Sequence, residues 1–249
     1  TMPTENNLEY FACNNNKFTY ATLPSHAHLN ETNYIYAPQA DIIIASKGPG
    51  ADLSSQLKAS TGTTTQYLWK KVEGTALVEG SDYSINGGVT KFINTNAGDI
   101  YCEMTNSSFP AFNGANVLKT TTIETAGMPT NLIAEFSTVN NADSVGLSLA
   151  AAREGIALYI DWAGDGNVTQ YLLGDTYSLF SASTTAGAKV KVYTYEPEDA
   201  ITVFSMSGAQ LSSFDGSRLT DAINISVDNA GLSEIKLPEN SSKLAEISL

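Results

Sequence analysis

The chain of 249 residues contains few of the residues that most often carry chemistry or cross-links, with only two cysteines and two histidines. Two cysteines cannot build a disulfide framework, and we predict that Cys13 and Cys102 are small buried side chains that are not bonded to each other. The chain also lacks any run of about 18 consecutive apolar residues, which excludes a predicted transmembrane helix.

Sequence motifs for catalysis are absent as well. The chain has no G-x-S-x-G, no H-E-x-x-H, no phosphate-binding G-x-x-x-x-G-K and no G-x-G-x-x-G. His26 and His28 are two residues apart, so an extended backbone would place both rings on one side, where they could hold a metal ion. Glu31 is the closest acidic residue, and no set of three or four ligands is complete. We therefore favour the interpretation that the two histidines are solvated side chains in a loop. We predict no catalytic site, no metal site and no cofactor.

Positive charge is scarce, because 13 basic residues stand against 26 acidic ones and the net charge is −13. Such a chain has no electrostatic footprint for nucleic acid and would be repelled by an anionic membrane. Charged residues make up only 16% of the chain, whereas serine, threonine, asparagine and glycine are abundant. This composition is typical of strand-rich surface proteins. The N-terminus carries neither an export signal nor a lipidation motif, so we expect that a secreted parent protein would have lost that segment.

A repeat stands at both ends of the chain. The spacing L-x-x-L-x-L-x-x-N-x-L fits one N-terminal copy and returns near the C-terminus with copies that begin at residues 201, 222 and 244, which are 21 and 22 residues apart. This interval lies in the range of leucine-rich repeats, whose short strands stack into a solenoid. The positions that match are Leu8, Phe11, Cys13, Asn16 and Phe18; Ile201, Phe204, Met206, Ala209 and Leu211; Ala222, Ile225, Val227, Ala230 and Leu232; and Leu244, Ile247 and Leu249.

The asparagine of this repeat normally bonds its side-chain amide to the backbone of the neighbouring coil. Ala209 and Ala230 replace it, so those two turns must satisfy their backbone groups in another way. About three stacked units are needed for a stable solenoid. We therefore expect a partial solenoid at each end, in residues 1–40 (a terminal repeat with a linker) and 200–249 (the start of an array), and a chain that is a piece of a longer protein.

Residues 41–126 show short alternating segments separated by turn signals, which predict a β-sandwich. The expected strands are 41–45, 65–71, 100–104 and 117–123, with Gly48-Pro49-Gly50 as a turn. Trp69 and Cys102 fall where an immunoglobulin-like core has its buried tryptophan and second cysteine. Leu53 or Leu57 stands at the first cysteine position, and Ile100 stands where a tyrosine corner would need a phenol. The alternative for Trp69 is an exposed platform for a sugar ring, and we favour the core position.

Residues 127–199 predict a second sandwich with strands at 131–136, 146–150, 157–162, 170–173 and 189–195, and a turn-rich connector at 174–187. The segment from Ile160 to Asn167 places Asp161, Asp165 and Asn167 in a tight glycine-containing loop. Those oxygens could bind calcium, but the alternate ligand positions and the final glutamate of an EF-hand are missing. Asp-Gly is also a common turn signal, and we favour a turn that holds no cation.

Taken together, the chain resembles surface leucine-rich-repeat proteins of Bacteroidetes type and is similar to internalin-like proteins. The resemblance rests on residues 8–18, on 97–106 with Phe109-Pro110, on 160–166 (similar to the D-W/F-G-D-G turn of polycystic-kidney-disease-type sandwiches), and on the repeats from Ile201. It implies a mainly β protein with a partial solenoid at each end and two sandwiches between them. It also implies an extracellular or cell-surface location and a role in adhesion or binding, and it does not specify the ligand.

The repeat geometry predicts where a partner would bind. Residues between the apolar positions of a repeat strand point to the concave face and stack at roughly 4.8 Å. In the C-terminal array they are Val203, Ser205, Ser207, Asn224, Ser226, Asp228, Glu246 and Ser248. This polar ladder suits a protein or glycan partner at a cell surface, although it could be merely a solvated face.

We predict a non-catalytic adhesion or protein-interaction role with the sandwiches as spacers. The alternative is a glycan-binding component of a polysaccharide-capture system, which an exposed Trp69 or Trp162 would favour.

Overall fold

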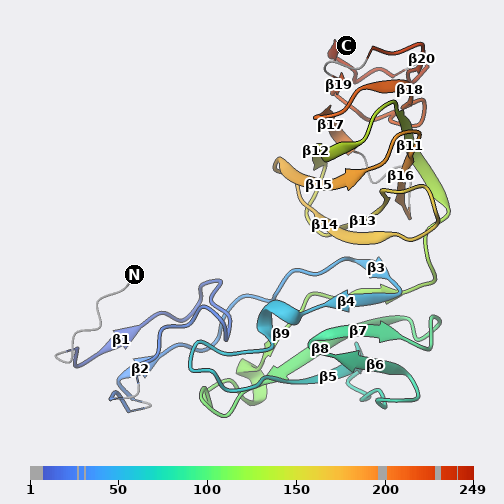
Figure 1. The fold of residues 1–249 in the computed structure, drawn as a ribbon. Coiled ribbons are helices and arrows are strands. Elements are labelled where there is room, and N and C mark those ends of the chain that lie inside the picture. The colour runs from blue at the N-terminus through green and yellow to red at the C-terminus, as the bar shows by residue number, and fades with distance from the viewer. Residues whose placement is uncertain (1–7, 27, 31, 196–200, 228–230, 240) are drawn as a thin grey trace. The chain divides into compact units, whose positions relative to one another are not determined.

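A computed structural model describes residues 8–26, 28–30, 32–195, 201–227, 231–239 and 241–249. The protein is mainly β with a solenoid-like arrangement of strands (Figure 1). Within the described ranges the only helical segments are two 3₁₀ turns, Ser54–Gln56 and Gly114–Asn116. The chain divides into two compact units, residues 1–127 and 128–249.

The first unit begins with two short parallel strands, β1 (Phe11–Ala12) and β2 (Tyr34–Ile35), in which Phe11 lies opposite Tyr34. The offset of 23 residues is that of a repeat, so a second coil follows the N-terminal copy that the sequence pattern detects. Aromatic residues occupy the buried positions of this second coil. Tyr34 and Tyr36 are both buried, and their rings lie 4.7 Å apart.

The rest of this unit consists of two sheets. One has the order β3 (Lys47–Gly48), β10 (Ile123–Thr125), β8 (Asp99–Thr105), β5 (Gln66–Lys71), with β9 (Leu118–Lys119) also paired to β8. The other has the order β4 (Gly50–Asp52), β7 (Val89–Phe92), β6 (Tyr83–Asn86). Trp69 of the first sheet donates its indole Nε1–H to Thr90 Oγ1 of the second at 3.1 Å, so its side chain bridges the two layers.

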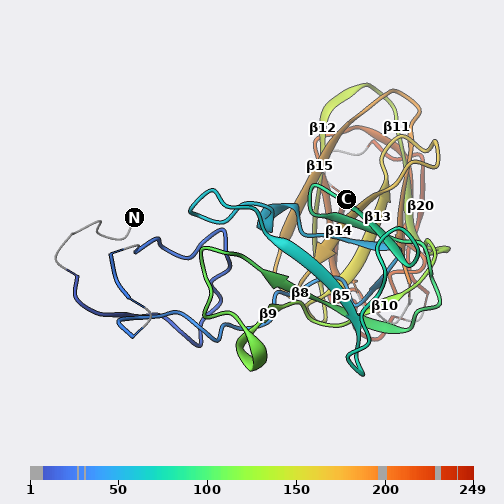
Figure 2. The ribbon, with the colours of Figure 1, turned by 90° about the horizontal axis from the view of Figure 1, so that it is seen from below.

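Two sheets also form the second unit. The larger has the order β14 (Thr169–Leu173), β13 (Ile156–Asp161), β16 (Lys189–Thr194), β11 (Asn131–Thr138), β18 (Leu211–Asp215), β20 (Glu234–Lys236). The smaller has the order β15 (Ser178–Thr184), β12 (Ala142–Ala151), β17 (Ile201–Ser207), β19 (Asn224–Val227), β21 (Glu246–Ser248). Figure 2 separates the layers, with β12 and β15 on one side and β11, β13 and β20 on the other.

The direction of pairing changes within each of these sheets. Strands up to β17 and β18 pair antiparallel, whereas β17, β19 and β21 run parallel, as do β18 and β20. Val203 pairs with Asn224 and Asn224 with Glu246, at the offsets of 21 and 22 residues read from the sequence. The expected repeat register from residue 201 onward is therefore present, and the repeats extend both layers of the preceding sheets.

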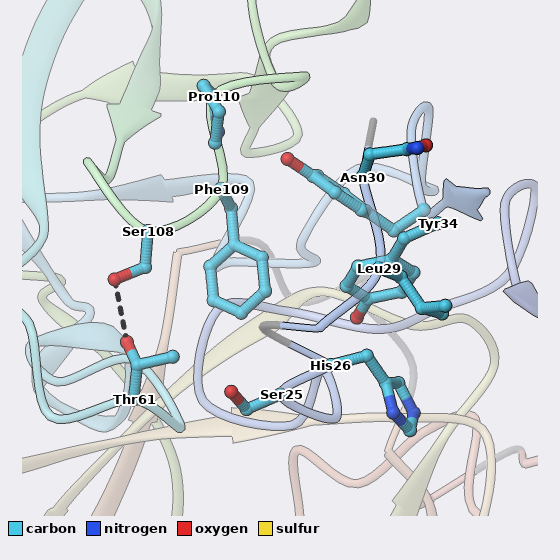
Figure 3. Close-up of a pocket in the computed structure, with 10 residues that line it drawn as sticks. Ser25, His26, Leu29, Asn30, Tyr34, Thr61, Ser108, Phe109 and Pro110 are labelled. Carbon is cyan, nitrogen blue, oxygen red and sulfur yellow. Dashed lines mark hydrogen bonds between the residues drawn. The ribbon is translucent and has the colours of Figure 1, made fainter. Parts of the chain in front are cut away.

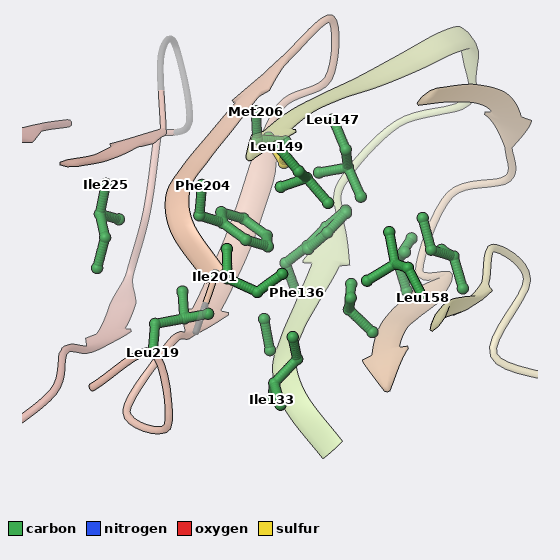
Figure 4. Close-up of a cluster of buried hydrophobic side chains, with 14 of the residues drawn as sticks. Ile133, Phe136, Leu147, Leu149, Leu158, Ile201, Phe204, Met206, Leu219 and Ile225 are labelled. Atoms are coloured by element: carbon green, nitrogen blue, oxygen red, sulfur yellow. The ribbon is translucent and has the colours of Figure 1, made fainter. Parts of the chain in front are cut away.

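A single buried cluster joins the two parts of this unit (Figure 4). Phe136, Leu147 and Leu158 from strands before residue 199 share it with Phe204 and Ile225 from the repeats. The predicted boundary between residues 199 and 200 therefore does not separate two hydrophobic cores. Residues 196–200 themselves lie outside the described ranges.

Two local expectations differ from the structure. Residues 41–45 form no strand beyond an isolated bridge between Ile42 and Thr120. The connector expected at 174–187 contains β15, an edge strand of seven residues. The alternation of apolar and polar residues in β15 is weak. The inward residues Phe180 and Ala182 are only half-buried, while the apolar Leu179 faces outward.

Candidate binding surfaces

The outward residues of the repeat strands form straight rows across the smaller sheet of residues 128–249. Ser205 of β17 pairs with Ser226 of β19, and Ser226 pairs with Ser248 of β21. Asn224 and Glu246 occupy the adjacent row, where Asn224 Nδ2 donates to Glu246 Oε2 at 2.7 Å. Seven of the eight residues of the predicted ladder are described, namely Val203, Ser205, Ser207, Asn224, Ser226, Glu246 and Ser248, and Asp228 lies outside the described residues.

These rows continue onto strands that precede the repeats, which the sequence argument did not assign to the surface. Ser148 of β12 lies opposite Ser205, so four serines stand in one row across four strands. Gly146 and Ala150 lie opposite Ser207 and Val203. We call the outward residues of β12, β17, β19 and β21 the ladder face. The alternation of small and apolar residues in 144–150 is the sequence signal that could have extended the ladder to β12.

Large apolar side chains stand beside the ladder face on the edge strand β15. Leu179 pairs with Ser148 and is 72% exposed. Tyr177 directly precedes β15 and is 69% exposed. The sheet therefore presents exposed apolar groups next to small polar groups, a combination typical of interaction surfaces.

The loop after β13 uses its acidic residue as an internal acceptor. Asp161 is buried, and its carboxylate accepts hydrogen bonds from the backbone N–H groups of Gly164 at 2.7 Å, Asp165 at 3.2 Å and Gly166 at 2.9 Å. Asp165 accepts from the backbone N–H of Asn167 at 2.9 Å. The carboxylate oxygens of Asp161 and Asp165 are thus engaged in holding a turn.

Both tryptophans belong to cores. Trp69 is fully buried against Phe92, with ring centroids 5.0 Å apart, and Trp162 is 8% exposed with its Nε1–H donated to Tyr171. Neither ring forms a platform for a sugar, and the core position favoured for Trp69 is confirmed.

The cysteines are free and buried, as expected. Burial raises the pKa of the Cys102 thiol to about 12 and also raises the pKa of Cys13. Both side chains therefore stay protonated at neutral pH and are poor nucleophiles.

A cavity of about 370 Å³ lies within residues 1–127 (Figure 3). Its apolar wall consists of Leu29, Tyr34, Tyr36, Phe109 and Pro110. Its polar wall consists of Ser25, His26, Asn30, Thr61 and Ser108. Sequence reasoning did not find this cavity, because residues 25–36 and 108–110 meet only in the folded chain.

Hydrogen bonds organise both walls. Thr61 Oγ1 donates to Ser108 Oγ at 2.9 Å, and Thr63 Oγ1 donates to Asn106 Oδ1 at 2.6 Å behind them. Tyr34 donates its hydroxyl to the carbonyl of Pro24, and its pKa is raised chiefly by burial. The phenol is therefore neutral, and the described lining carries no carboxylate, ammonium or guanidinium group.

The two histidines differ, contrary to the solvated pair expected from the sequence. His28 is exposed and its Nε2 lies 3.1 Å from the carbonyl of Leu8. His26 is only 8% exposed, packs against Phe11 and Tyr34, and has no hydrogen-bond partner for Nε2 among the described residues. Phe11 and Tyr34, whose rings contact His26, come from the two neighbouring strands β1 and β2.

Comparisons with known proteins found no match among family models, curated proteins or solved structures. Within the described residues, no group of three His, Cys, Asp or Glu side chains is close enough to hold a metal ion. The same residues include no helix with the length and apolar character needed to cross a membrane.

Proposed function

We propose that the chain is a non-catalytic part of a bacterial cell-surface or secreted protein that binds a protein partner through its ladder face. The observation that carries the proposal is the unbroken row Ser148, Ser205, Ser226 and Ser248, which is flanked by exposed Leu179. Small polar side chains at regular spacing give a shallow hydrogen-bonding surface, and an adjacent apolar group adds affinity when water is excluded.

The resemblance to surface proteins that combine leucine-rich repeats with β-sandwich domains has structural support at three places. Parallel strands at offsets of 21–23 residues support leucine-rich repeats at both ends. The two sheets around Trp69 and Cys102 support an immunoglobulin-like sandwich for residues 41–126. The turn held by Asp161 supports a second sandwich of the polycystic-kidney-disease type. Surface proteins that combine such modules use the sandwiches as spacers, which is the role we assign to them here.

Glycan capture through exposed tryptophans was the alternative suggested by the sequence. Burial of Trp69 and Trp162 removes the feature that favoured it. We therefore place protein-mediated adhesion first.

The proposal is tested with beads coated with the protein and incubated with cells or with immobilised extracellular proteins. Ser205→Arg places a bulky cation in the centre of the ladder face, and we expect it to reduce specific adhesion about tenfold. Ser213→Arg is the matched control, because Ser213 is a half-buried serine of β18 on the opposite sheet. Adhesion no greater than that of albumin-coated beads, or equal losses in the two variants, would contradict the proposal.

A further inference from the structure

We propose that the cavity between residues 25–36 and residues 61 and 108–110 binds one uncharged sugar residue. This site is distinct from the ladder face and from both tryptophans. A volume of about 370 Å³ lies at the lower end of the range for small-molecule pockets, and it suits a single ring better than an extended chain.

The chemistry of the two walls selects this class of ligand. A pyranose has an apolar face of C–H groups and a rim of hydroxyl groups. Leu29 and Pro110 supply the accessible apolar surface for that face, because Tyr34 and Phe109 are buried, and Figure 3 shows the Phe109 ring between Leu29 and the hydroxyl side chains of Ser108 and Thr61. Ser25 and Thr61 supply hydroxyl groups for the rim.

The lack of charged side chains in the described lining argues against anionic and cationic ligands. The described lining contains no Asp, Glu, Lys or Arg side chain, and the chain as a whole has a net charge of −13. A phosphate, sulfate or uronic acid would find no guanidinium or ammonium partner here. A cation would find no carboxylate.

His26 supplies the most specific contact. Its Nε2 is buried without a partner among the described residues, and a buried polar atom in that state costs free energy until a ligand satisfies it. An imidazole nitrogen can accept from or donate to a hydroxyl group, depending on its tautomer. A sugar hydroxyl that reaches Nε2 would therefore bind more tightly than its packing alone accounts for.

The test uses an array of neutral and acidic glycans, followed by calorimetric titration of the best neutral glycan. His26→Phe keeps the ring packing against Phe11 and Tyr34 but removes both nitrogens, so we expect an unchanged or higher melting temperature and binding weakened by about tenfold. Thr61→Trp fills the cavity from an exposed turn, and we expect it to abolish binding. His28→Phe is the matched control, because it makes the same change at an exposed ring outside the lining.

The outcomes separate this proposal from the function proposed for the ladder face. Loss of binding in His26→Phe and Thr61→Trp, with retention in His28→Phe and Ser205→Arg, supports the cavity. A protein that binds no neutral glycan or only acidic glycans overturns the proposal. It is also overturned if Ser205→Arg abolishes glycan binding while the cavity variants retain it.

Discussion

Asp161 illustrates how one buried carboxylate can organise a loop through hydrogen bonds from the backbone. Three consecutive backbone N–H groups converge on its two oxygens, and Gly164 adopts a positive φ of 73° where a Cβ would lie 2.6 Å from the carbonyl oxygen of Lys189. Glycine is required there by both backbone conformation and space. The Asp-Gly pattern predicted a turn, and the burial of Asp161 explains why an acidic residue begins it.

We predict that Asp161→Ala destabilises residues 128–249 by about 3 kcal/mol, because three N–H groups lose a charged acceptor in a buried site. Thermal denaturation followed by Trp162 fluorescence measures the change. Asp165→Ala is the control, since Asp165 is exposed and its carboxylate accepts hydrogen bonds from the neighbouring Asn167, and we expect little effect. Addition of calcium or of a chelator should leave the wild-type melting temperature unchanged. A clear rise with calcium would refute the turn interpretation.

At the scale of the elements, the N-terminal coils divide between two side chains, Asn16 and Gln39, the hydrogen bonds that the sequence pattern assigns to one asparagine. Asn16 Nδ2 bonds within its own coil, to the carbonyls of Cys13 and Asn14. Gln39, 23 residues later, bridges the coils by donating to the carbonyl of Cys13 at 2.7 Å and accepting from the N–H groups of Asn16 and Phe18 at 3.1 Å. A longer side chain thus makes the contact expected of the asparagine.

The C-terminal coils solve the same problem with serines and backbone groups. Ser233 donates its hydroxyl to the carbonyl of Ser212 at 2.8 Å, and Ser241 donates to the carbonyl of Thr220 at 2.9 Å. The N–H of Ile223 bonds the carbonyl of Thr202 at 2.7 Å. Groups about 21 residues apart thus carry hydrogen bonds between successive coils, while Ala230 itself lies outside the described residues.

Gln39→Ala should destabilise residues 1–127 by about 2 kcal/mol, because the bridging bonds are lost and two N–H groups are left without their acceptor. Denaturant titration in a Trp162→Phe background lets Trp69 report on this unit alone. Asn14→Ala serves as the control, since no side-chain hydrogen bond of Asn14 is seen among the described residues. Equal effects of the two substitutions would show that Gln39 does not hold the coils together.

For the whole of residues 128–249, the decisive feature is one core shared by the antiparallel sheets and the repeats. β12 pairs with β17 and β11 pairs with β18, so the first repeat supplies a neighbouring strand to each layer. Phe204, Met206 and Phe214 fill the space between the layers. A solenoid needs a terminus that seals its core, and the antiparallel strands provide that seal here.

A piece limited to residues 128–199 should therefore fail to fold cooperatively, because it exposes two strand edges and one side of its core. The piece 128–249 should unfold in a single transition. Circular dichroism and Trp162 fluorescence during urea unfolding distinguish the two. A sharp independent transition of 128–199 would instead support a separate second sandwich, as the sequence boundaries propose.

Local patterns alone predicted the strand-rich class, the repeat offsets of 21 and 22 residues and the outward residues from Val203 to Ser248, since strand alternation and coil period are written in neighbouring residues. Tertiary structure alone decided three other features: the extension of the ladder face to Ser148, the bridge made by Gln39, and the cavity around His26. Each depends on contacts between segments about twenty or more residues apart, and no local spacing specifies which distant strands will share a core.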